Sequence, residues 1–214
     1  MYPNNGEVPL DLSLFPRLEG VLDMIYNPSK TGLLLDAERL GIPHIGGLSM
    51  LVAQAKLAAE IFTGDRIEEG EIDRITGKIA RQSENIILIG MAGCGKTTVG
   101  KVLAERMGRE LIDTDRLVTE QTGRTPSDII EKEGEETFRR IETECVAMAG
   151  KLSGKIIATG GGVPTVKANH DLLRQNGIIV FLRRETELLD THDRPLSQKT
   201  SPGYFYYYHV TLYL

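Results

Sequence analysis

A glycine-rich segment near the middle of the chain has the residues needed to hold a nucleotide polyphosphate. Gly90 to Thr97 match the pattern GxxxxGKT at every fixed position, and they directly follow the apolar run 85–89. In this pattern the glycines let backbone N–H groups face the phosphates, the lysine reaches the β and γ oxygens, and the threonine hydroxyl can ligate magnesium. The segment therefore predicts a phosphate-binding loop for ATP and Mg²⁺, followed by a helix whose positive end adds to the site.

Two aspartates follow a second strand-like run. Asp113 and Asp115 come after Glu110-Leu-Ile, and strand alternation would point both carboxylates to the same side of the chain. Beside a metal polyphosphate, one carboxylate can order magnesium through water while the other orients a hydroxyl group or accepts its proton. A solvated turn with helix-capping aspartates is an equally good interpretation of these two residues alone.

Arg139 and a triple glycine indicate what an acceptor would carry. Arg139 lies in the segment GEETFRRIE, and Gly160, Gly161 and Gly162 follow another strand-like run. A planar guanidinium suits a carboxylate-bearing acceptor because it can form a bidentate pair, and glycines at a strand end expose backbone N–H groups. Taken singly, these residues would be a surface ion-pair residue and a turn. Together with the phosphate loop, they predict an acceptor site.

Composition and charge exclude several classes of protein. The chain has 214 residues, enough for one good core or for one domain plus part of another. Residues 1–84 hold 8 Lys/Arg against 13 Asp/Glu, which accounts for the whole net charge of −5, so we expect no nucleic-acid partner. With only Cys94 and Cys145, no run of transmembrane length and no secretory start, the sequence predicts a cytoplasmic protein without a membrane partner.

From residue 85 on, strand-like and helix-like stretches alternate. This alternation predicts an α/β fold of three layers, with a parallel sheet covered by helices on both faces and ligands at the carboxyl ends of the strands. Strands are expected at 85–89, 110–113, 155–159 and 177–182, and helices at 97–107, 126–149 and 167–175.

The front of the chain is organised differently. Residues 21–26 predict a short buried strand, and helices are expected at 31–40, capped by the first residue of that range, and at 49–62. The charged stretch 65–84 is expected to be a helical connector, because its aliphatic residues form one stripe at helical spacing. A domain boundary therefore falls within it.

Five motifs in the second part of the chain resemble those of one enzyme family. In chain order GMAGCGKTT, LIDTD, GEETFRRIE, ATGGG and DRPL, within residues 85–199, resemble shikimate kinase. The resemblance implies a compact P-loop kinase that transfers the γ-phosphoryl group of ATP to the 3-hydroxyl group of shikimate, with Mg²⁺. The products would be shikimate 3-phosphate and ADP, on the route to aromatic amino acids.

The same resemblance implies roles for individual residues. Lys96 would stabilise the transferring phosphoryl group, Thr97 would bind magnesium, and Asp113 would support the metal through water. Asp115 would hold and deprotonate the shikimate hydroxyl group. The other implied contacts are Arg139, Gly160, Gly161 and Gly162 for the acceptor, and Gly93, Cys94, Gly95, Thr98 and the lid residue Arg194 for the nucleotide.

The first part of the chain resembles a different family. The segments DMIYNPSKTGLLLDAERLG and GGLSMLVAQAKLAAEIFTG resemble the carboxyl-terminal end of shikimate dehydrogenase, which implies a short, mostly helical remnant of a Rossmann-type domain. Tyr26 and Gln54 correspond to shikimate-contacting positions of that family, and Gly47 and Met50 to positions near the nicotinamide. We favour an ordinary polar helix residue for Gln54 and a core filler for Met50, because the family's catalytic Lys and Asp lie in a part absent from this sequence.

The predicted order is a dehydrogenase remnant at 1–64, a charged helical linker at 65–84, a kinase domain at 85–200 and an aberrant Tyr-rich tail at 201–214. This order suggests a truncated piece of a bifunctional dehydrogenase–kinase that associates with the remaining dehydrogenase portion. No arginine follows Arg194, although the family has a further acceptor-binding arginine there. Two alternatives therefore stay open: a catalytically impaired fragment that keeps nucleotide binding, or another small-molecule P-loop kinase.

Overall fold

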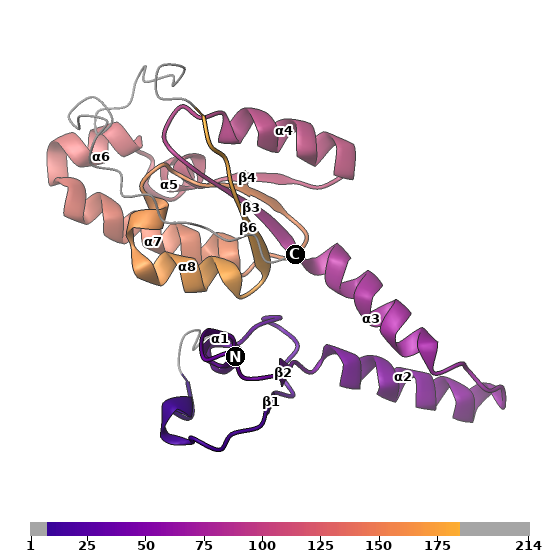
Figure 1. The fold of residues 1–214 in the computed structure, drawn as a ribbon. Coiled ribbons are helices and arrows are strands. Elements are labelled where there is room, and N and C mark those ends of the chain that lie inside the picture. Colours follow the sequence, from indigo (N-terminus) through magenta and orange to yellow (C-terminus); the bar gives the residue numbers. More distant parts are fainter. Residues whose placement is uncertain (1–7, 185–214) are drawn as a thin grey trace. The chain divides into compact units, whose positions relative to one another are not determined.

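The computed structural model describes residues 8–184 of the chain. These residues form two compact units (Figure 1): the first runs to Glu84 and includes Arg174–Asn176, and the second takes Asn85–Leu173 and continues from Gly177. Arg194 and the segment 201–214 lie outside the described residues. The second unit contains the predicted phosphate loop and acceptor residues, so it is the unit that builds the site.

A four-stranded parallel sheet forms the centre of the second unit. All four predicted strands are confirmed to within one residue at each end, and the helices on both faces give the predicted α/β class. The strands are β3 (Asn85–Ile89), β4 (Leu111–Asp113), β5 (Ile156–Ala158) and β6 (Gly177–Phe181), in the order β4-β5-β3-β6.

The two faces of the sheet pack against different helices. α4 (Lys96–Met107) lies on one face, where Ala104 packs against Leu88 and Ile156. α7 (Glu135–Gly150) and α8 (Lys167–Arg174) lie on the other face (Figure 1), where their apolar residues meet Ile87, Ile89 and Ile157. Successive residues of one strand point to opposite faces, and both faces are covered, which is why β3 and β5 are apolar nearly throughout.

The helices between β4 and β5 differ from the prediction. The single helix expected at 126–149 is two helices, α6 (Pro126–Glu133) and α7. They are separated at Gly134, whose φ of +89° cannot continue a helix. A further helix, α5 (Thr114–Thr122), was not predicted. It begins directly at the end of β4, without the intervening turn residues that usually separate a strand from a helix.

The first unit contains the predicted helices and only a short part of the predicted strand. α1 (Gly32–Arg39), with Thr31 as its N-cap, α2 (Leu48–Thr63) and α3 (Gly70–Ser83) match the expected ranges. The buried strand expected at 21–26 is confirmed only for its first two residues, of which Val21 alone is buried. Only β1 (Val21–Leu22) is extended there, paired with β2 (His44–Ile45) alone. A two-strand sheet has little surface to bury side chains, and Leu22, Met24 and Tyr26 are 84%, 75% and 54% exposed.

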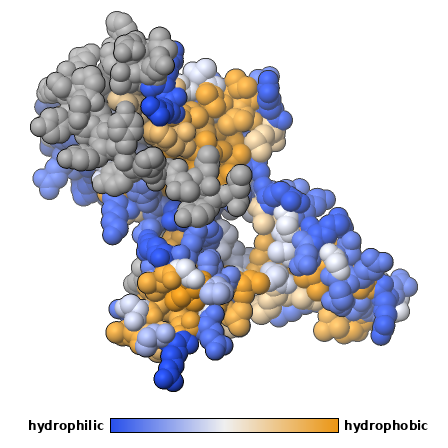
Figure 2. Space-filling view, in the orientation of Figure 1, coloured by the Kyte–Doolittle hydropathy of each residue, from blue (hydrophilic) through white to orange (hydrophobic). Residues whose placement is uncertain are grey.

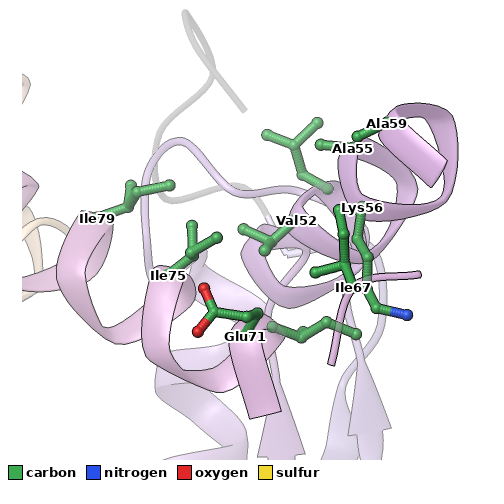
Figure 3. A pocket seen from close by; sticks show the side chains of 10 residues that line it. Val52, Ala55, Lys56, Ala59, Ile67, Glu71, Ile75 and Ile79 are labelled. Atoms are coloured by element: carbon green, nitrogen blue, oxygen red, sulfur yellow. The ribbon is translucent and has the colours of Figure 1, made fainter. Parts of the chain in front are cut away.

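The stripe of isoleucines in α3 lines an apolar groove against α2 (Figure 3). The groove has a volume of about 380 Å³, and Ile72, Ile75 and Ile79 line it from the α3 side. Hydrophobic side chains are also exposed elsewhere on the first unit (Figure 2), with Phe62 at 87%. Met50 is 41% exposed, so its interpretation as a core filler is wrong. None of the helices in residues 8–184 is long and apolar enough to cross a lipid bilayer.

The centre of the sheet should respond strongly to the loss of side-chain volume. Ile157 in β5 is fully buried, so Ile157→Ala leaves a cavity and is expected to lower the free energy of unfolding by about 2–5 kcal/mol. The matched control is Val102→Ala on α4, a position that is 46% exposed, where we expect less than about 1 kcal/mol. Urea unfolding followed by circular dichroism measures both, and equal midpoints for the two variants would contradict the assigned core.

Candidate active site

The phosphate loop connects β3 to α4. Gly90, Gly93 and Gly95 all adopt positive φ, at +149°, +81° and +98°. At Gly90 the need for glycine is strict, because a Cβ atom would run into the carbonyl oxygen of Leu182. Gly95 is the N-cap of α4 and provides no side chain to satisfy the first N–H groups of the helix. These N–H groups therefore suit an anion at the start of α4.

Lys96 is turned onto its own loop. Its side chain is almost completely buried, and Nζ donates to the carbonyl oxygens of Gly90 and Met91, at 2.8 Å each. The Cys94 sulfur lies 3.9 Å from the same nitrogen. The ammonium group is thus held over the loop, where a phosphate oxygen would be a stronger, charged acceptor for it.

A hydrogen bond joins Thr97, in the first turn of α4, to Asp113 at the end of β4. The Thr97 hydroxyl donates to Asp113 Oδ2 at 2.8 Å, and Asp113 Oδ1 accepts from the backbone N–H of Asp115 at 3.1 Å and of Arg116 at 3.4 Å. A hydroxyl and one carboxylate beside a phosphate loop fit Mg²⁺, which keeps several waters and takes most of its other ligands from phosphates. Within residues 8–184, no cluster of three His, Cys, Asp or Glu side chains could bind a metal without a substrate.

The sequence had suggested that the two aspartates alternate along one strand. The structure shows that they do not. β4 ends at Asp113, which is the N-cap of α5, and Asp115 lies in the first turn of that helix. The helix-capping interpretation is therefore correct for Asp113. The helical turn sends the Asp115 carboxylate to the triple glycine instead of along the edge of β4.

The triple glycine packs directly against the other parts of the site. The Gly160 N–H donates to the buried Thr114 hydroxyl at 2.8 Å. A Cβ atom on Gly160 would lie 2.6 Å from Asp115 Oδ1 and 2.7 Å from Glu142 Oε1. Two carboxylates therefore lie against this glycine, and a residue with a Cβ atom would have to displace one or both of them.

The next two glycines contact the phosphate loop and the arginine. A Cβ atom on Gly161 would be 2.8 Å from the backbone nitrogen of Ala92, and one on Gly162 would overlap the Arg139 guanidinium. A short 3₁₀ turn, Val163–Thr165, fixes this backbone, because Thr165 Oγ1 donates to the Gly162 carbonyl oxygen at 2.7 Å. The segment is thus a common wall between the loop and the residues predicted to hold an acceptor.

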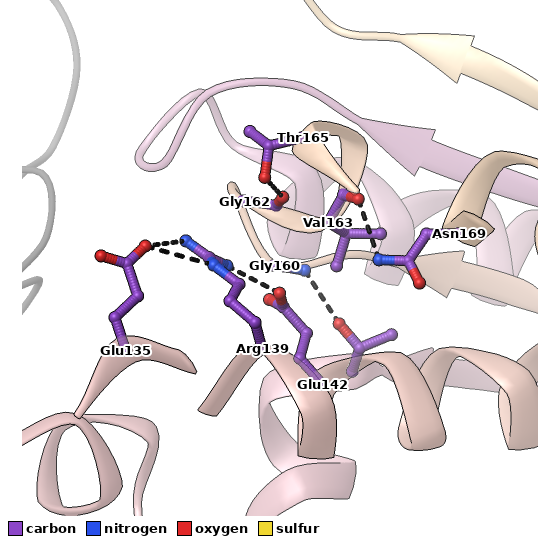
Figure 4. A network of polar contacts seen from close by, with 9 residues as sticks. Glu135, Arg139, Glu142, Gly160, Gly162, Val163, Thr165 and Asn169 are labelled. Carbon is purple, nitrogen blue, oxygen red and sulfur yellow. Dashed lines mark hydrogen bonds and ion pairs between the residues drawn. The ribbon is translucent and has the colours of Figure 1, made fainter. Parts of the chain in front are cut away.

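Arg139 lies between two carboxylates on the same face of α7 (Figure 4). Its Nη1 donates to Glu142 Oε2 at 2.6 Å, while Nε and Nη2 donate to Glu135 Oε1 at 3.3 and 3.1 Å. The Glu142 side chain is 1% exposed and that of Glu135 is 55% exposed. The Arg139 side chain is 22% exposed, and its Cζ lies 5.3 Å from the centre of the Phe138 ring.

Burial and neighbouring charges shift the pKa of both members of the buried pair. Burial raises the pKa of Glu142, the adjacent Arg139 opposes this, and the nearby carboxylates of Asp115 and Glu135 add to the rise. Burial alone would lower the pKa of Arg139, but the two glutamates outweigh it and raise that pKa. Sequence reasoning did not single out Glu142. Its signal was the spacing of three residues from Arg139, which puts both on one helix face.

Within residues 8–184, the remaining predicted nucleotide contacts lie on or beside the loop. Cys94 is buried, and its backbone N–H donates to the Met91 carbonyl oxygen at 3.2 Å, so this N–H already serves the loop's own turn. Thr98 is exposed in the first turn of α4. Arg194 lies outside the described residues. The structure thus brings the predicted loop, metal and acceptor residues of the described range into one place.

Comparisons with known proteins point to one family. A family model described as "Shikimate kinase" matches residues 92–207. A shikimate kinase of Symbiobacterium thermophilum is 46% identical over 125 residues, which is 55% of this chain and 72% of the relative. One of Caldanaerobacter subterraneus subsp. tengcongensis is 43% identical over 124 residues, 56% of this chain and 72% of the relative. The solved shikimate kinase of Acinetobacter baumannii in complex with shikimate is 42% identical, with a TM-score of 0.53 over 56% of this chain and 70% of that one.

The buried carboxylate of Glu142 should make stability depend on pH. Its pKa is raised in the folded protein, so the folded state binds this proton more tightly than the unfolded state does. The resulting stabilisation is fully present below about pH 4.3, the ordinary value for the unfolded chain, and is lost as the pH rises through the raised pKa. We therefore expect the free energy of unfolding of the wild type to fall relative to that of Glu142→Gln between pH 4 and pH 8.

Urea unfolding at several pH values checks this expectation. Glu144→Gln, at a position on the same helix that is 62% exposed, serves as the control and should follow the wild type at every pH. A gap between wild type and Glu142→Gln that stays constant with pH would show that the Glu142 proton is bound equally in the folded and unfolded states.

Proposed function

The chain belongs to the shikimate kinase family, and we propose that it transfers the γ-phosphoryl group of ATP to the 3-hydroxyl group of shikimate. The observation that carries this proposal is the shared wall between donor and acceptor residues. Gly161 lies against Ala92 of the phosphate loop, while Gly160 and Gly162 lie against Asp115 and Arg139. Phosphoryl transfer depends mainly on positioning and electrostatic stabilisation, and this wall brings the two substrates together.

The donor side would hold ATP through its phosphates. The N–H groups of the loop and of the first turn of α4 would bind the β and γ oxygens. Lys96 would redirect its ammonium group from the carbonyls of Gly90 and Met91 to the transferring phosphoryl group and stabilise its charge. Gly93, Cys94, Gly95, Thr98 and Arg194 are proposed as further nucleotide contacts.

The acceptor side would hold shikimate through its carboxylate and its reacting hydroxyl group. Arg139 would pair with the carboxylate and the Gly161 N–H would add a donor. The Asp115 carboxylate would orient the 3-hydroxyl group and take its proton as the oxygen attacks the γ-phosphorus. The bond between the γ-phosphorus and the bridging oxygen breaks in the same transfer, which leaves ADP.

Thr97 and Asp113 would hold Mg²⁺. The Thr97 hydroxyl would bind the ion directly, and Asp113, already hydrogen-bonded to it at 2.8 Å, would bind it through water. When bound, the ion would neutralise charge on the β and γ phosphates. Asp113 is itself anchored by two backbone N–H groups of α5, so its carboxylate is fixed before any ligand arrives.

For the first unit we propose a relationship to the carboxyl-terminal end of shikimate dehydrogenase, with association with the rest of such an enzyme. The exposed apolar side chains there support this, since Leu22 and Phe62 are 84% and 87% exposed and surfaces of this kind mark protein contacts. Of the residues that correspond to ligand contacts of that family, Tyr26 is 54% exposed. Gly47 is buried, and a Cβ atom there would run into the backbone of Met24. We further propose that the protein works in the cytoplasm.

Removing the charge of Lys96 on the ATP side, or that of Asp115 on the acceptor side, should abolish turnover. Lys96→Ala and Asp115→Asn are each expected to reduce shikimate-dependent ADP formation by at least about a hundredfold, because each removes a group that acts in the transition state. Lys101→Ala and Glu120→Gln change exposed residues of the same two helices and should leave the rate unchanged. A coupled assay for ADP measures all four variants.

The same assay separates this function from its alternatives. ATP turnover of equal size without shikimate, or with gluconate in its place, would reject the proposed acceptor. Tight ATP binding without any shikimate binding in calorimetry would favour the impaired fragment.

The hydroxyl of Thr97 should set the magnesium requirement. Thr97→Val removes the hydroxyl at nearly constant shape, so the Mg²⁺ concentration for half-maximal rate is expected to rise by about tenfold or more. Thr97→Ser keeps the hydroxyl and should stay close to the wild type. Removal of Mg²⁺ with a chelator should stop the wild-type reaction. Equal magnesium dependence in the two variants would show that Thr97 is not a ligand.

A further inference from the structure

We propose that Glu135 lowers the affinity for carboxylate acceptors by acting as an internal competitor for Arg139. Its carboxylate lies on the edge of the guanidinium that the acceptor's carboxylate would use, so it must move away before that acceptor can bind. The inference rests on the proposed function, because it takes Arg139 as the group that binds the carboxylate of shikimate. In this role Glu135 acts through Arg139 and does not touch the acceptor.

The two carboxylates on Arg139 are held very differently (Figure 4). Glu142 accepts one short bond of 2.6 Å from Nη1 and is 1% exposed. Glu135 accepts two longer bonds on a single oxygen, 3.3 Å from Nε and 3.1 Å from Nη2, and is 55% exposed. Glu142 is therefore a fixed partner, whereas Glu135 can rotate into solvent.

The edge that Glu135 occupies is the one suited to an incoming carboxylate. A guanidinium presents Nε and Nη2 as two parallel donors, which match the two oxygens of a carboxylate. Glu142 bonds to Nη1 and leaves that edge to others. Glu135 bridges both donors with one oxygen, so it fills this edge without forming the optimal fork.

An exchange of this kind costs a carboxylate acceptor part of its binding energy and costs a neutral acceptor nothing. Exposed ion pairs are weak, so an acceptor carboxylate can replace Glu135 and restore the charge balance of Arg139. A neutral acceptor offers no charge in return, and therefore leaves Glu135 where it is. Glu135 thus weakens the binding of every carboxylate acceptor somewhat, and it leaves the binding of neutral molecules that resemble the substrate unchanged.

Kinetics of Glu135→Gln at saturating ATP and Mg²⁺ test the proposal. The KM for shikimate is expected to fall about two- to fivefold, the range for removing a weak competing ion pair. The kcat should stay within about twofold, since Glu135 touches neither the hydroxyl group nor the phosphates. Glu136→Gln is the matched control: it removes the same charge from the same exposed first turn of α7, and its KM should equal that of the wild type.

Binding measurements exclude a merely structural effect. Calorimetry should show tighter shikimate binding to Glu135→Gln than to the wild type. A neutral analogue, with the carboxylate replaced by a hydroxymethyl group, should gain nothing from the substitution. An unchanged or higher KM for shikimate, or an equal gain for the neutral analogue, would overturn the inference while wild-type turnover keeps the proposed function intact. Absence of shikimate-dependent turnover in the wild type itself would overturn both.

Discussion

The site depends on the parallel pairing of β3 with β5. Leu88 pairs with Ala158, and the Thr159 N–H donates to the Leu88 carbonyl oxygen at 3.1 Å, so both strands end level at the same edge of the sheet. The phosphate loop follows one strand and the triple glycine follows the other. A slip of one residue would turn every side chain of a strand to the opposite face, away from the helix, α4 or α7, against which it packs. The core thus fixes the distance between the donor and acceptor sides.

Arg139 makes the acceptor side electrostatically feasible. Asp115 and the buried Glu142 both lie against Gly160, and two carboxylates so close repel each other unless a cation or a proton intervenes. The 2.6 Å bond between Arg139 and Glu142 supplies the cation. The pKa of Glu142 is still raised, because the side chain is buried and the Asp115 carboxylate lies nearby. The proposed acceptor site, with an anionic acceptor beside the Asp115 carboxylate, would therefore need this guanidinium even when it is empty.

The sequence predicted most of the strands, the helices and the phosphate loop, because these follow regular patterns. It predicted less of the site features that depend on a single residue. The loop, the four strands and the capped helix after Thr31 follow from local rules of spacing and turn chemistry. The position of Asp113 was harder to predict, because a residue that ends a strand and caps a helix satisfies both patterns at once. The place of Glu142 in the site could not be predicted from the sequence, because it depends on the burial of its carboxylate beside Gly160. The strand expected at 21–26 is shorter and less buried than predicted, because a run of apolar residues does not reveal whether anything covers it.

The break between α6 and α7 links the fold to the chemistry of the acceptor side. In a single helix through 126–149, Glu135 would lie in mid-helix. The positive φ of Gly134 instead starts a new helix there, and an exposed carboxylate in a first turn is stabilised by the helix dipole. From this end, exposure falls along one face of α7, from Glu135 at 55% to Arg139 at 22% and Glu142 at 1%. The same residue type is therefore exposed with two longer hydrogen bonds at one end of the row, and buried with one short hydrogen bond at the other.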